Sequence, residues 1–87
     1  MEIVYTEKAI EDLSYWKKIG NKVVQKRITQ LISGIEDTPF KGIGKPEALK
    51  YELSGFWSRR IDKEHRLVYK VYEKESLIEI HSLKGHY

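Results

Sequence analysis

The chain has 87 residues, of which 40% are hydrophobic, 33% charged and 11% aromatic, and its formal net charge is +3. This length suits a single domain spanning residues 1–87 with a modest core, and the composition excludes an intrinsically disordered chain. The sequence contains no cysteine, no recognisable signal peptide and no apolar run near the ~20 residues of a membrane span, so we expect a cytoplasmic protein without disulfides or thiolate metal sites.

The first half predicts one strand and two helices. The segment EIVYT alternates and is rich in β-formers, which predicts a strand ending near Thr6, a residue able to cap the next helix. That helix carries apolar side chains at three-residue steps and ends at Gly20; its inward residues are expected to be Ile10, Leu13 and Trp16.

A second helix is predicted to begin after Asn21, whose side chain can cap it, and to end before DTPF. Four apolar residues follow the 3.6-residue period closely: Val24, Ile28, Leu31 and Ile35. Polar residues occupy the opposite side: Lys22, Lys26, Gln30 and Ser33. The next stretch, TPFKGIGKP over 38–46, is rich in proline and glycine and predicts a loop.

The second half predicts strands joined by short turns, in the segments YEL, FWSRRI, HRLVYKVYE and SLIEIHSL. Consecutive strands with short connections form an antiparallel meander. We therefore predict an α+β fold in which an N-terminal strand and a two-helix hairpin accompany an antiparallel sheet, with both helices packed on one face.

Strand periodicity assigns side chains to the two faces of this sheet. Apolar sets such as Leu67 with Tyr69, and Ile78 with Ile80, should meet the helices. Arg60 and Arg66 should then lie on the other face. Basic residues interleaved with aromatic ones between residues 41 and 69 favour phosphate contact with base stacking, although a solvated basic face is an equal alternative.

No metal or nucleotide site is predicted from the motifs. The spacing of His65, His81 and His86 matches no familiar metal-ligand pattern, and no metal or other cofactor is expected. Metal-free RNA cleavage needs a base for the 2′-hydroxyl, a cation for the phosphoryl group and an acid for the 5′-oxygen. Glu47, Arg66 and His86 are possible candidates for these three roles.

Each candidate also has an ordinary structural explanation, and taken singly that explanation is the commoner one. Glu47 follows Pro46 and could simply belong to a loop. Arg66 could be an exposed cross-strand partner, and His86 could belong to an inert terminus. Spacing alone therefore gives only a weak signal for catalysis.

A resemblance strengthens this hypothesis. The block GIGKPEALKYELSGFWSRRIDKEHRLVYKV, the ending HY and the helix piece SYWKK resemble the YoeB/Txe family of toxins from bacterial toxin–antitoxin modules, relatives of RelE. The resemblance runs essentially end to end. It implies a RelE-like, microbial-ribonuclease-type fold and an endoribonuclease that cuts mRNA in the ribosomal A site without a metal and so inhibits translation.

The resemblance also assigns roles and partners. It implies Glu47 as general base, Arg66 as stabiliser of the phosphate and His86 as general acid, with Tyr87 orienting the site or stacking on a base. The further positions it places around the substrate or the catalytic network are Lys50, Arg60 and Glu64. It implies toxin dimers, a YefM-type antitoxin in a hetero-oligomer, and contact with operator DNA only through that antitoxin.

Two alternatives remain at this stage. A non-enzymatic toxin comparable to the ParE type could use the same scaffold, although such proteins do not share the nuclease residues. A degenerate relative could bind antitoxin and RNA without cutting. Ala48 stands where the family often has proline, and Gly85 precedes the final HY. Both residues give the backbone more freedom, so the geometry of the site is less well defined than the identity of its residues.

Overall fold

A computed structural model describes residues 1–85 of the chain. Its elements are β1 (Glu2–Tyr5), α1 (Glu7–Lys18), α2 (Lys22–Asp37), β2 (Glu47–Ala48), the 3₁₀ turn η1 (Tyr51–Leu53), β3 (Trp57–Arg60), β4 (Arg66–Tyr72) and β5 (Leu77–Ser82). The strand order is β1-β5-β4-β3-β2. The α+β prediction is confirmed, and the β2-β3-β4-β5 pairings are antiparallel. The sheet is nevertheless mixed, because β1 runs parallel to β5.

Both helices begin at the predicted caps. The side-chain oxygen of Thr6 accepts a hydrogen bond from the amide of Ala9 at 3.1 Å, and that of Asn21 accepts one from Val24 at 3.0 Å. Such caps satisfy amides that have no partner within the helix. Within residues 1–85, neither helix combines the length and the apolar character needed to cross a membrane.

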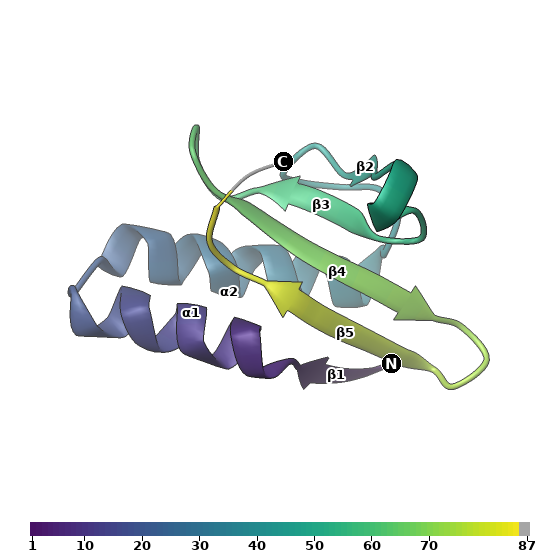
Figure 1. The fold of residues 1–87 in the computed structure, drawn as a ribbon, viewed down its shortest axis with the longest axis horizontal. Coiled ribbons are helices and arrows are strands. Elements are labelled where there is room, and N and C mark those ends of the chain that lie inside the picture. Colours follow the sequence, from purple (N-terminus) through teal and green to yellow (C-terminus); the bar gives the residue numbers. More distant parts are fainter. Residues whose placement is uncertain (86–87) are drawn as a thin grey trace.

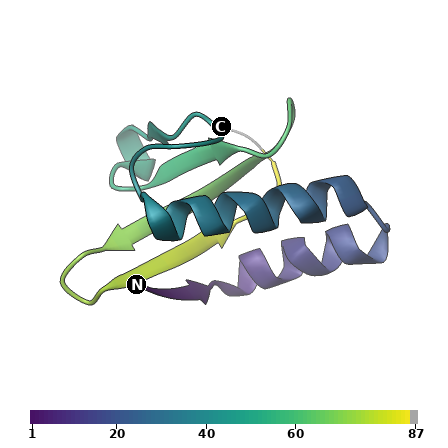
Figure 2. The ribbon, with the colours of Figure 1, turned by 180° about the vertical axis from the view of Figure 1, so that it is seen from behind.

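The two helices cover one face of the sheet, as the ribbon shows from the front and from behind (Figures 1 and 2). The core forms between them and the sheet, from Ala9, Trp16, Val24, Ile28, Leu31, Ile35, Ile61, Leu67, Tyr69, Ile78, Ile80 and Leu83. The predicted inward face of α2 is confirmed. On α1 the prediction for Ile10 is wrong: this side chain is exposed, and Asp12 is buried instead.

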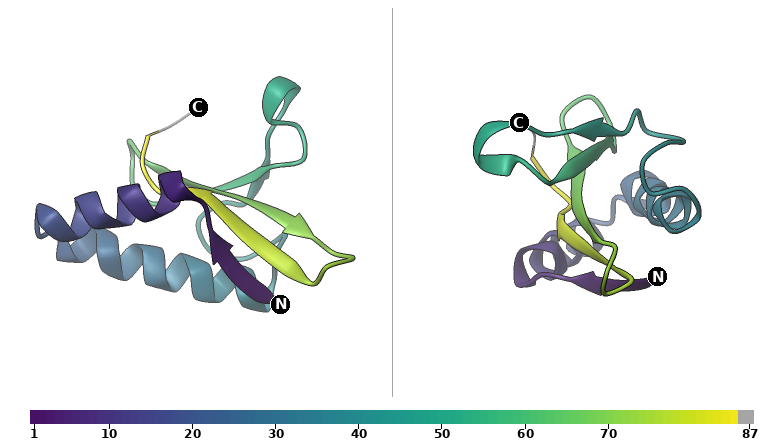
Figure 3. Two further views of the ribbon diagram at one scale, coloured as in Figure 1. Left: turned by 60° about the horizontal axis from the view of Figure 1, so that its bottom comes forward. Right: turned by 90° about the vertical axis from the view of Figure 1, so that its right-hand side faces the viewer.

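The segment YEL is not a strand. Tyr51 has a positive φ of 57°, which lies outside the extended region of regular strands, and residues 51–53 form the turn η1. The strand before β3 is instead the two-residue β2, which pairs with β3 at Glu47↔Ser58 and Ala48↔Trp57. This β2-η1-β3 segment rises on the side of the sheet away from the helices (Figure 3).

Arg59 lies on the face of β3 opposite Arg60, as strand alternation predicts, so it is not part of the accessible basic and aromatic surface. Its side chain is fully buried on the helix-covered side, as is that of Tyr69. Nε of Arg59 donates to the Tyr69 hydroxyl at 3.2 Å, and Nη1 donates to the carbonyl of Ile43 at 3.2 Å. Nη2 donates to the carbonyls of Thr38 at 2.6 Å and Lys41 at 2.9 Å. The buried guanidinium thus anchors the predicted loop, which leads directly to β2.

Candidate functional site

The register of three strands brings the predicted acid and arginines to one face of the sheet. Glu47 lies opposite Ser58, and Arg60 lies opposite Arg66. Directly opposed residues share a face, and Ser58 shares its face with Arg60 because they are two residues apart. All four side chains therefore lie on the face that the helices leave uncovered, which we call the helix-free face.

Two hollows meet at the arginines. The smaller, of about 50 Å³, is lined by Lys45, Glu47, Leu49, Ser58, Arg60 and Arg66. The larger is a groove of about 530 Å³, lined by Arg27, Arg60, Ile61, Asp62, Lys63 and Arg66. The first places a carboxylate among three cationic side chains, and the second extends the cationic lining toward α2.

Like charges that face each other across two strands repel. Arg60 and Arg66 stand in this arrangement, and within residues 1–85 no carboxylate forms an ion pair with either of them. Among residues 1–85, Nη1 of Arg66 donates only to the backbone carbonyl of Asp62, at 3.4 Å. An anion held between the two guanidinium groups would relieve the repulsion, and a phosphate accepts two parallel N–H donors from one arginine.

Backbone hydrogen bonds fix the strands that carry these arginines. The amide of Arg60 donates to the carbonyl of Gly44 at 2.7 Å, and Nη2 of Arg27 donates to the carbonyl of Arg60 at 3.1 Å. Gly44 has a φ of +84°, and a Cβ at this position would lie 2.6 Å from Cδ2 of Leu31. Only glycine lets the loop pass this close to α2 and still pair with β3.

The remaining predicted residues lie at different distances from this centre. Lys50 lines a neighbouring hollow of about 300 Å³ that also includes Glu47. Glu64 has an exposed side chain in the turn between β3 and β4, with Oε2 3.9 Å from Nε2 of His65, and it lines none of these three hollows. The predictions for His86 and Tyr87 lie outside the described residues.

The other end of the helix-free face is aromatic. Nζ of Lys70 lies 5.3 Å from the ring centroid of Phe56 and 5.1 Å from that of Tyr72. The Phe56 ring in turn lies 5.0 Å from the ring of His81. The helix-free face therefore combines cations with aromatic rings, as the alternation of the strands predicts.

Two residues around the hollows were not assigned to the site from the sequence: Ser58 lines the smaller one, and Arg27 lines the groove. Lys45, which also lines the smaller one, belongs to the basic stretch that favours phosphate contact. The two-residue spacing from Arg60 was a usable signal for Ser58. No comparable signal was available for Arg27, because the position of a residue on a helix does not indicate which strand it approaches. Across residues 1–85, no three His, Asp or Glu side chains cluster in a way that could hold a metal ion.

Comparisons with known proteins agree over nearly the whole chain. A family model described as YoeB-like toxin of bacterial type II toxin–antitoxin system matches residues 5–87. Toxin YoeB of Escherichia coli K12 is 49% identical over 78 residues, which cover 90% of this chain and 92% of that protein. Toxin YoeB of Streptomyces coelicolor is 51% identical with the same coverage.

Solved structures give the same result for the fold. The YoeB/ParE toxin from Agrobacterium tumefaciens superposes with a TM-score of 0.94 at 38% identity, with full coverage of both chains. A chain of the YoeB–YefM complex from Staphylococcus aureus superposes with a TM-score of 0.87 at 43% identity, covering 100% of this chain and 98% of that one.

Proposed function

Because this chain belongs to the YoeB family of toxins from bacterial type II toxin–antitoxin systems, we propose that it is a ribosome-dependent endoribonuclease that cleaves mRNA in the A site. The observation that carries the proposal is the hollow that holds Glu47 beside two opposed arginines, Arg60 and Arg66, without a carboxylate ion-pair partner for either among residues 1–85. A carboxylate beside two cationic side chains suits metal-free phosphodiester cleavage, which needs a base for the 2′-hydroxyl and a cation for the phosphoryl group.

The proposed reaction is an internal displacement at phosphorus. The 2′-oxygen of the RNA attacks the adjacent phosphorus while Glu47 accepts the 2′-hydroxyl proton. Arg66, aided by Arg60, holds the non-bridging oxygens as negative charge builds on them. The bond from phosphorus to the 5′-oxygen then breaks, and His86 donates a proton to that oxygen. The products are a 2′,3′-cyclic phosphate and a 5′-hydroxyl, and no water or metal takes part in this step.

The other assigned residues serve the substrate rather than the proton transfers. Tyr87 is proposed to stack on a base or orient the site. Lys50 lines the neighbouring hollow that it shares with Glu47, where its charge suits a phosphate next to the one that reacts. Glu64 is proposed to act through the surrounding network, since it lines none of the hollows described above. Arg27 and Lys63 extend the cationic groove beyond Arg60 and give the RNA backbone a path.

The partners follow from the relatives. Staphylococcus aureus YoeB has been solved in a YoeB–YefM toxin–antitoxin complex and as a dimer, at 43% and 42% identity to this chain. We propose a YefM-type antitoxin for this toxin, in a hetero-oligomer that contacts operator DNA only through the antitoxin. We also propose that the toxin forms a homodimer and that it is located in the cytoplasm, where it can bind the ribosome.

The decisive experiment is primer extension on a message after the protein is induced in a bacterium. Cuts should fall within translated codons and disappear when the start codon of the message is removed. Glu47→Gln, Arg66→Ala and His86→Gln should each reduce cleavage by roughly 10²-fold or more, the scale of a lost proton transfer or charge contact. Circular dichroism of each variant confirms that it is folded.

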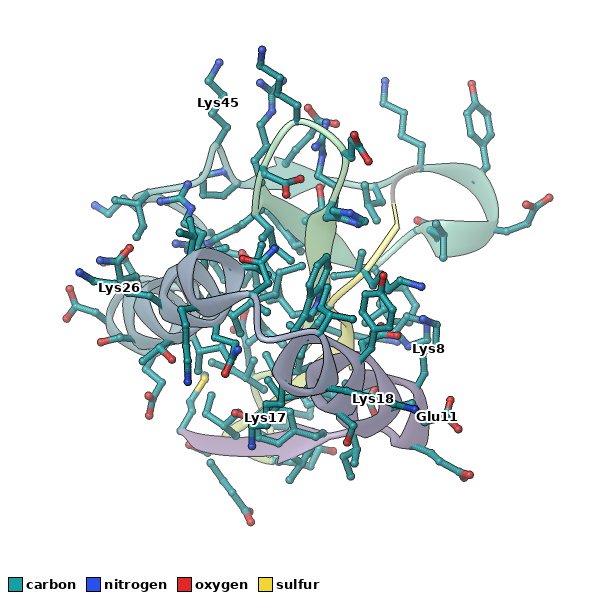
Figure 4. The ribbon with its side chains drawn as sticks, turned by 90° about the vertical axis from the view of Figure 1, so that its left-hand side faces the viewer. Lys8, Glu11, Lys17, Lys18, Lys26 and Lys45 are labelled. Atoms are coloured by element: carbon teal, nitrogen blue, oxygen red, sulfur yellow. The ribbon has the colours of Figure 1, made fainter. Side chains whose placement is uncertain are left out.

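Lys17→Ala provides the matched control. It removes one positive charge from α1, and in Figure 4 Lys17 lies on the opposite side of the molecule from Lys45, which lines the smaller hollow. Cleavage should be unchanged. Undiminished cleavage in the three site variants would refute the proposal. Inhibition of gyrase supercoiling by the pure protein would instead support the ParE-type alternative.

A further inference from the structure

The chain leaves the sheet after β5, and two side chains of α1 then hold the backbone of Leu83. The amide of Leu83 donates to Oδ2 of Asp12 at 2.9 Å, and the carbonyl of Leu83 accepts from Nε1 of Trp16 at 2.9 Å. Both bonds are buried. Asp12 has an exposed fraction of only 4%, and a carboxylate is costly to bury without such partners. Both polar groups of the Leu83 backbone are thus held by α1.

Two residues later, a second pair of hydrogen bonds holds Gly85. Its amide donates to Nδ1 of His65 at 2.9 Å, and its carbonyl accepts from the amide of Arg66 at 2.8 Å. Gly85 has a φ of +92°, a conformation that favours glycine. The backbone at Gly85 is therefore fixed in position and direction beside one of the two opposed arginines.

The imidazole of His65 is itself oriented. Its ring meets Trp16 edge-on, with the centroids 4.9 Å apart, and Trp16 is the same residue that binds the carbonyl of Leu83. Nδ1 accepts a hydrogen bond only if it carries no proton, so the neutral ring has its hydrogen on Nε2. Nε2, the nitrogen that then carries the hydrogen, lies 3.9 Å from Oε2 of Glu64.

We propose that His65 is a positioning residue whose Nδ1 fixes the Gly85 amide and thereby sets the point from which the chain continues to His86. The proposal rests on the proposed function, since His86 is the assigned acid. A general acid must come within hydrogen-bond reach of its leaving group, and a misplacement of about 1 Å can cost 10²-fold in rate. The bond to Gly85 acts one residue before that acid.

The acceptor can be tested by exchanging the ring for side chains of defined reach. In His65→Asn, the amide oxygen takes approximately the place of Nδ1 and can still accept from Gly85. In His65→Gln, the polar group sits one atom further out, and His65→Leu has none. We expect kcat to fall by roughly 10- to 100-fold in the Gln and Leu variants with KM unchanged, and to be retained in the Asn variant. Lys17→Ala, the control away from the hollows, should leave kcat unaltered.

Two measurements on the protein without RNA separate this proposal from the proposed function. Hydrogen exchange of the Gly85 amide should be slow in the wild type and in His65→Asn, and faster in His65→Leu. Nitrogen NMR of the wild type should place the imidazole hydrogen on Nε2, a result that does not require any variant to fold.

Equal exchange at Gly85 in all variants, a hydrogen on Nδ1, or an Asn variant as slow in cleavage as the Leu variant would each overturn the role of His65. If the wild type cleaves no RNA but the exchange and NMR results are as expected, the assigned reaction fails and the anchoring of Gly85 stands.

Discussion

Arg59→Lys should cost far more stability than the same substitution at the neighbouring position, Arg60→Lys. The two arginines are adjacent in sequence, but Arg59 is fully buried and Arg60 is exposed. Lysine retains the positive charge at both positions. The comparison therefore isolates the forked shape of the buried guanidinium from its charge.

The size of the effect follows from the hydrogen bonds of Arg59. Its three nitrogens reach four acceptors, which lie in the loop and on Tyr69. A single ammonium can at best replace the two bonds of Nη2, so the partners of Nε and Nη1 are lost. At about 1.5–3 kcal/mol for each bond to a charged donor, the loss is roughly 3–6 kcal/mol. The whole domain is stabilised by about 4–13 kcal/mol, at ~0.05–0.15 kcal/mol per residue.

Urea titration followed by tryptophan fluorescence measures the difference. Trp57 in β3 is a local probe, since its ring lies 5.0 Å from that of Phe40 in the anchored loop. For Arg59→Lys we expect the midpoint to fall by more than about 1 M, or the protein to be partly unfolded in buffer. Arg60→Lys should stay within about 0.5 kcal/mol of the wild type. Equal stability of the two variants would show that the buried fork is not what holds the loop.

The remaining predictions concern the same loop and its supports. Burial raises the pKa of Tyr69 above its ordinary value of 10.0, and Arg59 opposes this rise. The neutral hydroxyl of Tyr69 therefore stabilises the fold fully below pH ~10, and this contribution is lost as the pH climbs through the raised pKa. Between pH 8 and pH 11 the free energy of unfolding should therefore fall more in the wild type than in Tyr69→Phe, and parallel losses in urea titrations would contradict this. Gly44→Ala should destabilise by about 2–4 kcal/mol, because its Cβ would meet Leu31 at 2.6 Å in addition to the positive φ. Gly20→Ala has a positive φ but open space around the Cβ and should cost only about 1 kcal/mol; similar thermal midpoints for the two would argue against the steric explanation.

The structural features that depend on side-chain periodicity and on helix capping could be predicted from the sequence. The inward residues of α2, both helix caps and the opposite placement of Arg59 and Arg60 follow from local rules. Periodicity says which residues share a face but not which strands pair, so the parallel contact of β1 with β5 was not predicted. The segment at Tyr51 looked like a strand by composition, and its positive φ depends on how the β2-η1-β3 segment folds.

Buried polar groups were the harder part to foresee. Asp12 and Arg59 belong to residue types that normally lie in solvent, and each is buried because distant backbone groups need a partner. The candidate site was partly visible, since Glu47 and Arg66 were named from the chemistry and the family resemblance. Their meeting in one hollow depends on the register of β2, β3 and β4, which no local pattern encodes.

The position of β5 in the sheet has a consequence for how the protein is made. β5 is the last strand of residues 1–85, yet it lies between β1 and β4. Among residues 1–85, β1 pairs only with β5, so during synthesis β1 has no partner strand and the core lacks Ile78 and Ile80 until β5 has been made. Domains fold as units, and contacts between distant parts of a chain form late. The complete sheet therefore forms only after β5 has been synthesised, although its other four strands precede β5 in the chain.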